Sequence, residues 1–506
     1  MMIKINSFFL CGLLFLLSCK LAIGMRMDRP AIVAGRAKIE GRITVPAGIK
    51  KDSIFVTVTI PHPITGEHVS QKAFVDQSGN FSIDFDVETD TSFIGLYSSV
   101  NPYKTLIIKS INKNTTIINI DYNTNLDIKN MDVKPTMNQS DMNQGLEILG
   151  KMVAYRPDRA PKPLYDKSPD EFLNYAKSIM SERLALFLNK DTLLSKEFKG
   201  AVSKEFRLFM YITHVFDYER QMMHNYRNTT GHKTDTPDIQ KIDASYFRFL
   251  KDFNLNDPQY LHTFTFSEFQ NAILQNKVLK LPTIEESDIS TWLAGVKAVL
   301  SDLVGFDEGP YYDILVANAF ARQLNEELKP LSEKQKENIA HYWGNGEIPK
   351  ILFRKNQQTV ELAKVKSPTV VNDITSVPED KVMEAIVSKY QDKVVCIDLW
   401  ATWCAPCLEA INQFRRTKGE FKDKDVVFVY LTNGSSPQQL WEEKIKGIGG
   451  EHYYLTKTQW NFMMDYFGFE GIPSYLLYNK DGVLKNKFTA FPGNDAVKEI
   501  INSLLK

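Results

Sequence analysis

The stretch Trp400–Cys407, which reads Trp-Ala-Thr-Trp-Cys-Ala-Pro-Cys, says more about fold and chemistry than any other part of the chain. Its cysteines, Cys404 and Cys407, are two residues apart, a spacing at which a small disulfide can close. If a helix begins at Cys404, the sulfur faces the unpaired N–H groups and the positive end of the helix dipole. Such a position stabilises a thiolate, the species that attacks disulfides. Pro406 suits the first turn of a helix, where its missing N–H would have no partner.

The number and spacing of the cysteines favour redox chemistry over a zinc site. A structural zinc site normally needs four Cys or His ligands in paired spacings. The chain has no second Cys-x-x-Cys pair, and the nearest histidine, His452, stands alone. A purely structural disulfide is the other alternative, but so short a loop constrains the unfolded chain weakly. The chain has five cysteines: Cys11, Cys19, Cys396, Cys404 and Cys407.

The residues before the dithiol are typical of a buried strand that leads into the turn. Val394–Trp400 is a short apolar run with β-branched residues, and Leu408–Phe414 continues with helical spacing. Open α/β sheets place their sites at this carboxyl end of a strand. Asp398 interrupts the apolar run, and a carboxylate buried there is costly unless it is paired or protonated. We expect burial to raise the pKa of Asp398, which makes it a candidate proton acceptor for Cys407. The alternative is a strand-end aspartate that faces solvent.

Residues 369–506 resemble the thioredoxin fold, specifically the TlpA/ResA-like branch of extracytoplasmic thiol–disulfide oxidoreductases. Val394–Cys407 carries the strand, the buried Asp and the Trp-Cys-x-x-Cys turn of that family. Phe469–Tyr478 matches its cis-proline segment, and Asn479–Gly482 follows as an Asp-Gly hairpin turn.

The resemblance also implies roles for residues around the dithiol. Pro473 is expected to be cis and to pack against the cysteines, although an ordinary trans turn proline is the alternative. The backbone at Ile472 would pair with the substrate chain, and Trp403 would shield the cysteine pair. Ile472 and Trp403 are therefore the predicted substrate-binding residues.

The predicted activity is reduction of disulfides in protein or peptide substrates. Cys404 would attack the substrate, and Cys407, deprotonated with help from Asp398, would release it. The resemblance implies no bound cofactor and an upstream membrane thiol donor. Dithiol proteins span about −270 to −120 mV, so a disulfide oxidase or isomerase on the same fold is an alternative. A second alternative is an envelope binding lipoprotein in which residues 1–365 capture a ligand and the redox module is accessory.

Residues 1–24 have the features of a secretory signal. Ser7–Ser18 is rich in Leu and Phe but shorter than the ~20 apolar residues of a membrane-spanning helix. Leu16–Cys19 resembles a bacterial lipobox, which would leave Cys19 as a lipid-modified first residue. Ala22–Gly24 offers ordinary cleavage as the alternative. We expect export to the periplasm or cell envelope, and slightly favour a lipid anchor in the membrane.

Length and composition indicate several packed domains. A chain of 506 residues predicts about three or four domains. With 61 basic and 61 acidic residues and no long basic run, nucleic acid is not an expected partner. A hydrophobic share of 43% and an aromatic share of 11% favour packed cores over disorder.

The period of the apolar residues divides the chain before the redox domain into two parts. In residues 31–130, segments such as Ile54–Ile60 alternate apolar and polar side chains, which predicts a small β-sandwich. In residues 135–364 the period is helical, with capping boxes that start at Ser168 and Ser332.

Phe198–Met223 also reads as a helix in this middle part. The predicted fold class is therefore multidomain: a β-sandwich, an all-α middle domain and, at residues 369–506, an α/β thioredoxin fold.

Overall fold

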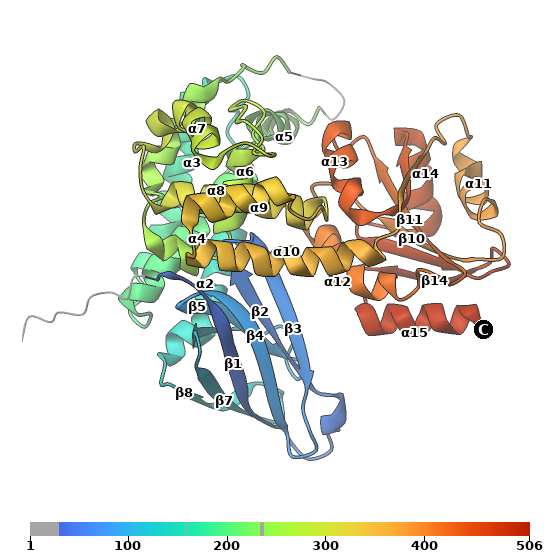
Figure 1. The fold of residues 1–506 in the computed structure, drawn as a ribbon, viewed down its shortest axis with the longest axis horizontal. Coiled ribbons are helices and arrows are strands. Elements are labelled where there is room, and N and C mark those ends of the chain that lie inside the picture. The colour runs from blue at the N-terminus through green and yellow to red at the C-terminus, as the bar shows by residue number, and fades with distance from the viewer. Residues whose placement is uncertain (1–29, 158, 233–236) are drawn as a thin grey trace, which may run out of the picture. The chain divides into compact units, whose positions relative to one another are not determined.

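The computed structural model describes residues 30–157, 159–232 and 237–506 (Figure 1). The predicted signal peptide at residues 1–24 and the lipidation site at Cys19 lie outside these residues. From amino to carboxyl terminus the described chain is rich in strands, then helical, then of mixed strands and helices. This order confirms the predicted multidomain fold class.

Two four-stranded sheets make up the first part of the chain, in the orders β4-β1-β7-β8 and β3-β2-β5-β6. Side chains from both sheets share one apolar core, as in a sandwich. The alternation that the sequence predicts is clear in β4, where Phe81, Ile83 and Phe85 are buried and the residues between them are exposed. The strands are β1 (Ile32–Thr44), β2 (Phe55–His62), β3 (Glu67–Phe74), β4 (Asn80–Thr89), β5 (Thr91–Ser98), β6 (Leu106–Ile111), β7 (Thr115–Tyr122) and β8 (Ile128–Lys134).

The middle of the chain is helical, and its helices begin where the sequence offers caps. Both predicted capping boxes are present, at Ser168 with Glu171 and at Ser332 with Gln335. The single helix expected over Phe198–Met223 is wrong: it is two helices, because Asp217 caps a new helix through the N–H of Arg220. The helices are α2 (Gln139–Ala154), α3 (Pro169–Arg183), α4 (Lys196–His214), α5 (Tyr218–Thr230), α6 (Phe266–Leu274), α7 (Ile289–Val304), α8 (Pro310–Glu326), α9 (Glu333–Trp343) and α10 (Glu347–Val365). A π-helical segment at Leu184–Asn189 and 3₁₀ segments at Ala244–Phe253 and Pro258–His262 also lie in this part. Two further 3₁₀ segments, Lys51–Ser53 and Glu379–Lys381, lie before and after it.

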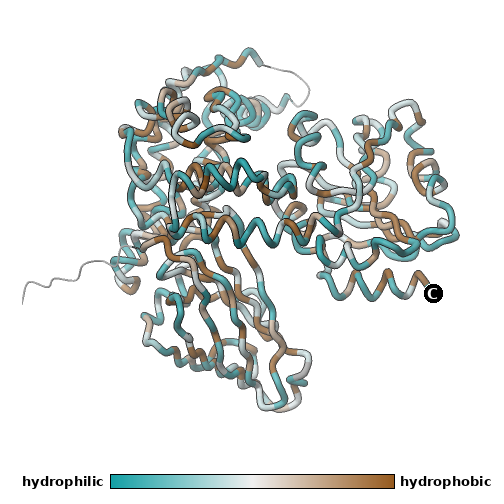
Figure 2. The backbone as a smooth tube through the Cα atoms, in the orientation of Figure 1, coloured by the Kyte–Doolittle hydropathy of each residue, from teal (hydrophilic) through white to brown (hydrophobic). Residues whose placement is uncertain are grey.

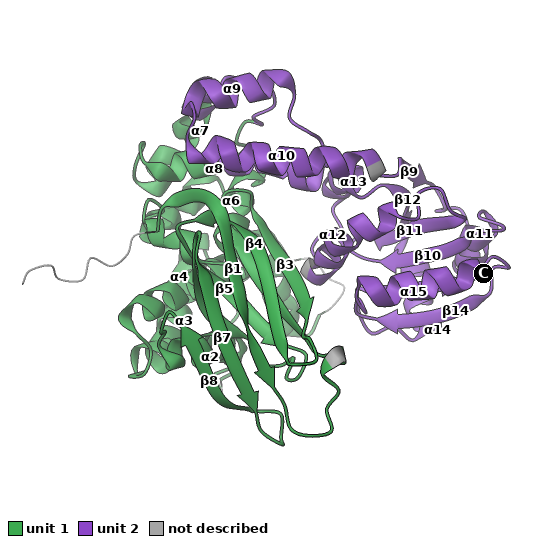
Figure 3. Cartoon of the chain, turned by 60° about the horizontal axis from the view of Figure 1, so that its bottom comes forward, with its two compact units in different colours: residues 1–282, 294–315 green, residues 283–293, 316–506 purple. Residues whose placement is uncertain are grey.

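The chain forms two compact units, coloured separately in Figure 3. One contains residues up to 282 together with 294–315, and the other contains residues 283–293 and 316–506. The division falls inside the predicted helical domain, within α7 and α8. The carboxyl-terminal α/β part therefore shares its unit with α9, α10 and the end of α8.

The carboxyl-terminal part is built on a six-stranded sheet in the order β14-β13-β10-β11-β12-β9. The central strand β10 pairs in parallel with β11 and antiparallel with β13. The strands are β9 (Thr369–Asn372), β10 (Val394–Leu399), β11 (Val426–Asn433), β12 (Gly450–Leu455), β13 (Ser474–Tyr478) and β14 (Leu484–Thr489). The helices are α11 (Val382–Ser388), α12 (Ala405–Gly419), α13 (Gln438–Ile448), α14 (Lys457–Phe467) and α15 (Asn494–Leu505).

Each face of this sheet has its own apolar core. Val395, Ile397 and Leu399 point to the face that α11 and α14 cover. Cys396 points to the opposite face, where α12 and α15 pack. Because side chains alternate along a strand, Asp398 lies on the α12 face with Cys396. Figure 2 shows hydrophobic residues along the strands of this part and a mixed pattern along α10.

Candidate active site

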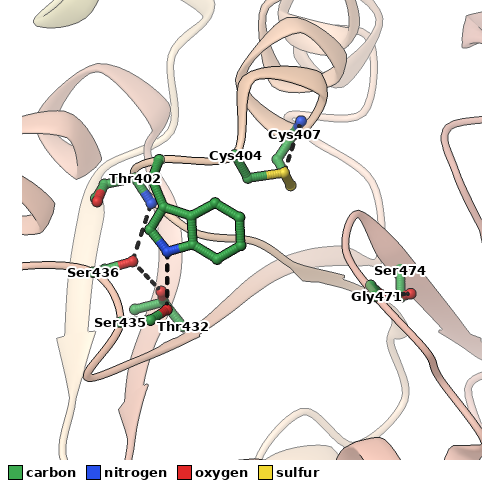
Figure 4. Close-up of a disulfide and its surroundings, with 9 residues drawn as sticks. Thr402, Cys404, Cys407, Thr432, Ser435, Ser436, Gly471 and Ser474 are labelled. Carbon is green, nitrogen blue, oxygen red and sulfur yellow. Dashed lines mark hydrogen bonds between the residues drawn. A yellow bond between two sulfur atoms is a disulfide. The ribbon is translucent and has the colours of Figure 1, made fainter. Parts of the chain in front are cut away.

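Cys404 and Cys407 form a disulfide at the start of α12, with their Cα atoms 5.3 Å apart (Figure 4). Cys404 occupies the N-cap position, and its Sγ accepts the backbone N–H of Cys407 at 3.2 Å. The first sulfur therefore sits at the unpaired N–H groups of the helix, where negative charge is stabilised. Cys404 keeps 3% of its surface exposed and Cys407 none, so Cys404 is the more accessible residue of the pair.

The loop after β11 holds the turn through two serine hydroxyl groups (Figure 4). Ser435 Oγ accepts the indole Nε1–H of Trp403 at 3.0 Å. Ser436 Oγ accepts the backbone N–H of Thr402 at 3.0 Å and contacts Thr432 Oγ1 at 2.8 Å. Trp403 remains 54% exposed beside the disulfide. It is therefore fixed at its polar edge and presents an apolar ring to solvent.

The Ile472–Pro473 peptide bond is cis, as the sequence resemblance implies. Ile472 is half-buried and packs against the apolar cluster that contains both Cys404 and Cys407. Ser474 Oγ donates to the carbonyl of Gly471 at 2.7 Å and closes this turn. The structure thus brings the proline segment, through Ile472, to the dithiol.

Asp398 lies on β10 beneath α12. It is half-buried, and its Oδ1 atom is enclosed without a hydrogen-bond partner among the residues that the structure describes. Burial raises the pKa of Asp398 to about 8, and the charge of Lys418 acts in the opposite direction. The carboxyl group therefore changes its charge near neutral pH, as a proton acceptor for a thiol must.

Comparison with known families decides the identity of this part of the chain. Residues 378–502 match the family model described as Redoxin. The carboxyl-terminal part is a Redoxin domain of the thioredoxin superfamily. With its Cys-x-x-Cys pair, the Redoxin domain is a thiol–disulfide oxidoreductase domain, as the sequence predicts.

Solved structures similar to this chain include three thioredoxin-type proteins, each similar over about a quarter of it. A thioredoxin-family thiol:disulfide interchange protein from Chlorobium tepidum is 19% identical, over 28% of this chain and 97% of that one, with a TM-score of 0.21. The thioredoxin domain of a thiol–disulfide oxidoreductase from Bacteroides vulgatus is 17% identical, over 24% of this chain and 84% of that one, with a TM-score of 0.21. An exposed lipoprotein thioredoxin from Streptococcus pneumoniae is 20% identical, over 23% of this chain and 89% of that one, with a TM-score of 0.21. No curated protein matches the chain significantly.

Lys418 is a buried cation of the Redoxin domain that the sequence reading missed. Its Nζ donates to the carbonyls of Gly449 at 2.7 Å and Ile448 at 3.0 Å, and to the hydroxyl of Tyr430 at 3.1 Å. Burial, followed by the charge of Arg415, lowers the pKa of Lys418, whereas three acceptors match the three N–H groups of its ammonium form. The signal was present in the sequence: Lys418 is eleven residues after Cys407 and continues the buried face of α12.

The sequence analysis also did not predict the two serines that hold the cysteine turn, although their position beside it could have been inferred. Ser435 and Ser436 follow β11, which is parallel to β10 and ends at the same edge of the sheet. Loops at that edge surround the site in open α/β sheets. In the described part of the chain, no group of three Cys, His, Asp or Glu side chains is placed to hold a metal ion. None of the described helices combines the length and the apolar character needed to span a membrane.

Proposed function

We propose that this protein is an exported thiol–disulfide oxidoreductase that reduces disulfides of protein or peptide substrates through Cys404 and Cys407. The observation that carries the proposal is the position of the disulfide: Cys404 Sγ caps α12 and accepts the N–H of Cys407 at 3.2 Å. The amino-terminal sequence, with its signal-like run and its lipobox at Cys19, supports export and a lipid anchor.

The reaction uses sulfur alone as the electron carrier. In the reduced enzyme, the thiolate of Cys404 attacks one sulfur of the substrate disulfide, and the other sulfur leaves as a thiolate. Asp398 then accepts the proton of Cys407, whose thiolate attacks Cys404 and expels the second substrate sulfur. The dithiol of the enzyme is oxidised and the substrate disulfide is reduced, with two electrons transferred. An upstream membrane thiol donor restores the dithiol.

The surroundings of Cys404 suit an extended polypeptide as substrate. Trp403 offers a large, mostly exposed ring on one side of the disulfide. Ile472, which precedes the cis-proline bond, packs against the apolar cluster that contains both cysteines. An apolar ring and the main chain at Ile472 would recognise a polypeptide without requiring one sequence, because such contacts are non-directional or made to main-chain groups.

A covalent trap tests the proposal. The Cys407→Ser variant should accumulate mixed disulfides on Cys404, because the second attack is lost while the first remains. Cys404→Ser is the matched control and should trap nothing. Equal and negligible trapping by both variants would contradict the proposal, and mass spectrometry of the trapped species identifies the substrates.

The direction of electron flow has its own measurement. Equilibration of the wild-type protein with a glutathione redox buffer gives the equilibrium constant of the dithiol. A potential near the reducing end of the range, about −270 mV, supports a reductase. A value near about −120 mV would instead assign the site to a disulfide oxidase or isomerase.

A further inference from the structure

Asp398 belongs to a row of polar side chains that crosses the sheet beneath α12. It lies opposite Tyr475 on the antiparallel strand β13 and beside Tyr430 on the parallel strand β11. Tyr430 in turn lies beside His452 on β12, and the two rings stack with centroids 5.0 Å apart. Register partners on neighbouring strands point to the same face of a sheet. We call these four residues, Tyr475, Asp398, Tyr430 and His452, the polar row.

A cavity of about 40 Å³ adjoins the polar row on the α12 side. Asp398, Tyr475 and Tyr430 are among its lining residues, together with the half-buried Phe488 and Phe491. A cavity needs only about 10–15 Å³ to hold one water molecule. The space is therefore large enough for one water molecule.

Two polar atoms of these lining residues lack a hydrogen-bond partner among the described residues. They are Oδ1 of Asp398 and the buried hydroxyl of Tyr475, a residue that is 8% exposed as a whole. Buried polar atoms are normally satisfied by protein or by ordered water, because leaving them unpaired is costly. The hydroxyl of Tyr430, by contrast, already accepts a hydrogen bond from Lys418 at 3.1 Å.

We propose that Tyr475 is a positioning residue for the proton step, and that its hydroxyl hydrogen-bonds the carboxylate of Asp398 through one water molecule held in this cavity. The inference rests on the proposed function, in which Asp398 accepts the proton of Cys407. When the S–H bond of Cys407 breaks, its proton forms the carboxylic acid of Asp398. Its sulfur bonds to Cys404 as the Cys404–substrate disulfide bond breaks, and the substrate sulfur leaves as a thiolate. The acid then passes the proton to the cavity water and to solvent, and the carboxylate is restored.

Among the charged and titratable groups around Asp398, Tyr475 is the one assigned as the neutral hydrogen-bond donor to its carboxylate. From α12, Lys418 favours the carboxylate by its charge. Burial lowers the pKa of His452 to about 3, so the imidazole stays neutral. Burial and the charge of Asp398 raise the pKa of Tyr475, which therefore remains a neutral donor. The other neighbours with an ionisable or charged side chain are Arg415 on α12, Tyr430 on β11 and Cys396 on β10, whereas α15 and β14 contribute Val497 and Phe488 to the cavity wall.

Infrared titration of the oxidised full-length protein tests the proposal. In the disulfide form the two cysteines do not titrate, and the C=O stretch of protonated Asp398 is identified by its loss in Asp398→Asn. Tyr475→Phe should raise the midpoint of this band by about one pH unit, because the ionised form loses a hydrogen bond. Tyr478→Phe removes a hydroxyl from the opposite face of the same strand and should leave the midpoint unchanged. An unchanged midpoint in Tyr475→Phe would overturn the proposal.

A second variant separates the water from the hydroxyl. Ala410→Val adds two methyl groups to the cavity wall and should raise the midpoint without touching Tyr475. A shift in Ala410→Val but not in Tyr475→Phe would show a water site that Tyr475 does not control, and would also overturn the proposal. Insulin reduction by the wild-type protein is measured separately. An inactive protein that still shows the Tyr475-dependent shift would refute the proposed function and leave this link between Tyr475 and Asp398 standing.

Discussion

Asp398 couples the stability of the Redoxin domain to pH. Burial raises its pKa from 3.8 to about 8. Between these values the folded domain keeps a proton that the unfolded chain releases. The free energy of unfolding therefore falls as pH rises through this window, and the penalty is complete above about pH 8. The proposed proton acceptor thus carries a cost in stability.

The Asp398→Asn variant should remove this cost. Each pH unit in the window is worth about 1.4 kcal/mol, and partial access of water to Asp398 reduces the total. We expect the variant to be more stable than wild type by about 2–4 kcal/mol at pH 8 and by little at pH 4. Urea unfolding of the oxidised protein, followed by tryptophan fluorescence, measures both values. Asp423→Asn changes an exposed residue and serves as control. A stability difference that is the same at both pH values would contradict the assigned ionisation.

Some residues of the candidate site could be predicted from the local sequence pattern. Others could not, because their positions depend on pairing between strands that are distant in the sequence. The strand of Asp398 and the turn of the cysteines follow from neighbouring residues, so the sequence was sufficient for them. Lys418 continues a helical stripe and could have been found. Tyr475 could not, because its place opposite Asp398 depends on the register between β10 and β13, which are far apart in the sequence.

The loop between β11 and α13 shapes the active turn through two serines with different surroundings. Ser436 is fully buried, and its hydroxyl accepts the N–H of Thr402. Ser435 instead bonds the edge of Trp403, a side chain that is mostly exposed. A hydrogen bond to a buried N–H costs more to lose than one at the surface. The first serine should therefore support the fold and the second should orient the substrate surface.

Ser435→Ala should change substrate binding with little effect on stability. We expect the free energy of unfolding to fall by less than about 1 kcal/mol. Without its anchor the Trp403 ring should move, so acrylamide should quench its fluorescence more strongly and KM for a protein disulfide should rise about threefold, with kcat nearly unchanged. Ser436→Ala is the comparison and should destabilise the domain by about 1–3 kcal/mol. Unchanged quenching and KM in Ser435→Ala would show that the bond does not position the ring.

At the scale of the whole molecule, the Redoxin domain shares its compact unit with helices that precede it. Arg415 on α12 donates to the carbonyl of Asn325 at 2.8 Å, and Arg322 on α8 pairs with Glu443 on α13 at 3.1 Å. A Cβ at Gly447 would lie 1.6 Å from the carbonyl oxygen of Glu326, so only glycine allows this approach. The helical period ends at residue 364 and the family resemblance begins at residue 369, which predicted a boundary there. Neither signal shows which helices pack on the domain that follows.

Truncation tests whether the helices before residue 367 stabilise the Redoxin domain without taking part in disulfide reduction. Residues 367–506 keep the sheet, the cysteines and the polar row, but lose Asn325, Arg322 and Glu326 as partners. We expect this fragment to unfold at a lower urea concentration than residues 283–506. Its free energy of unfolding should be lower by about 1–3 kcal/mol, because buried contacts of α12 and α13 are lost. Insulin reduction per folded molecule should be equal in the two fragments, since no proposed catalytic group lies before residue 367. Equal stability would show that α8 to α10 are not part of the domain's support. Loss of activity in the folded short fragment would instead give the preceding residues a part in the reaction, as a binding protein with an accessory redox module requires.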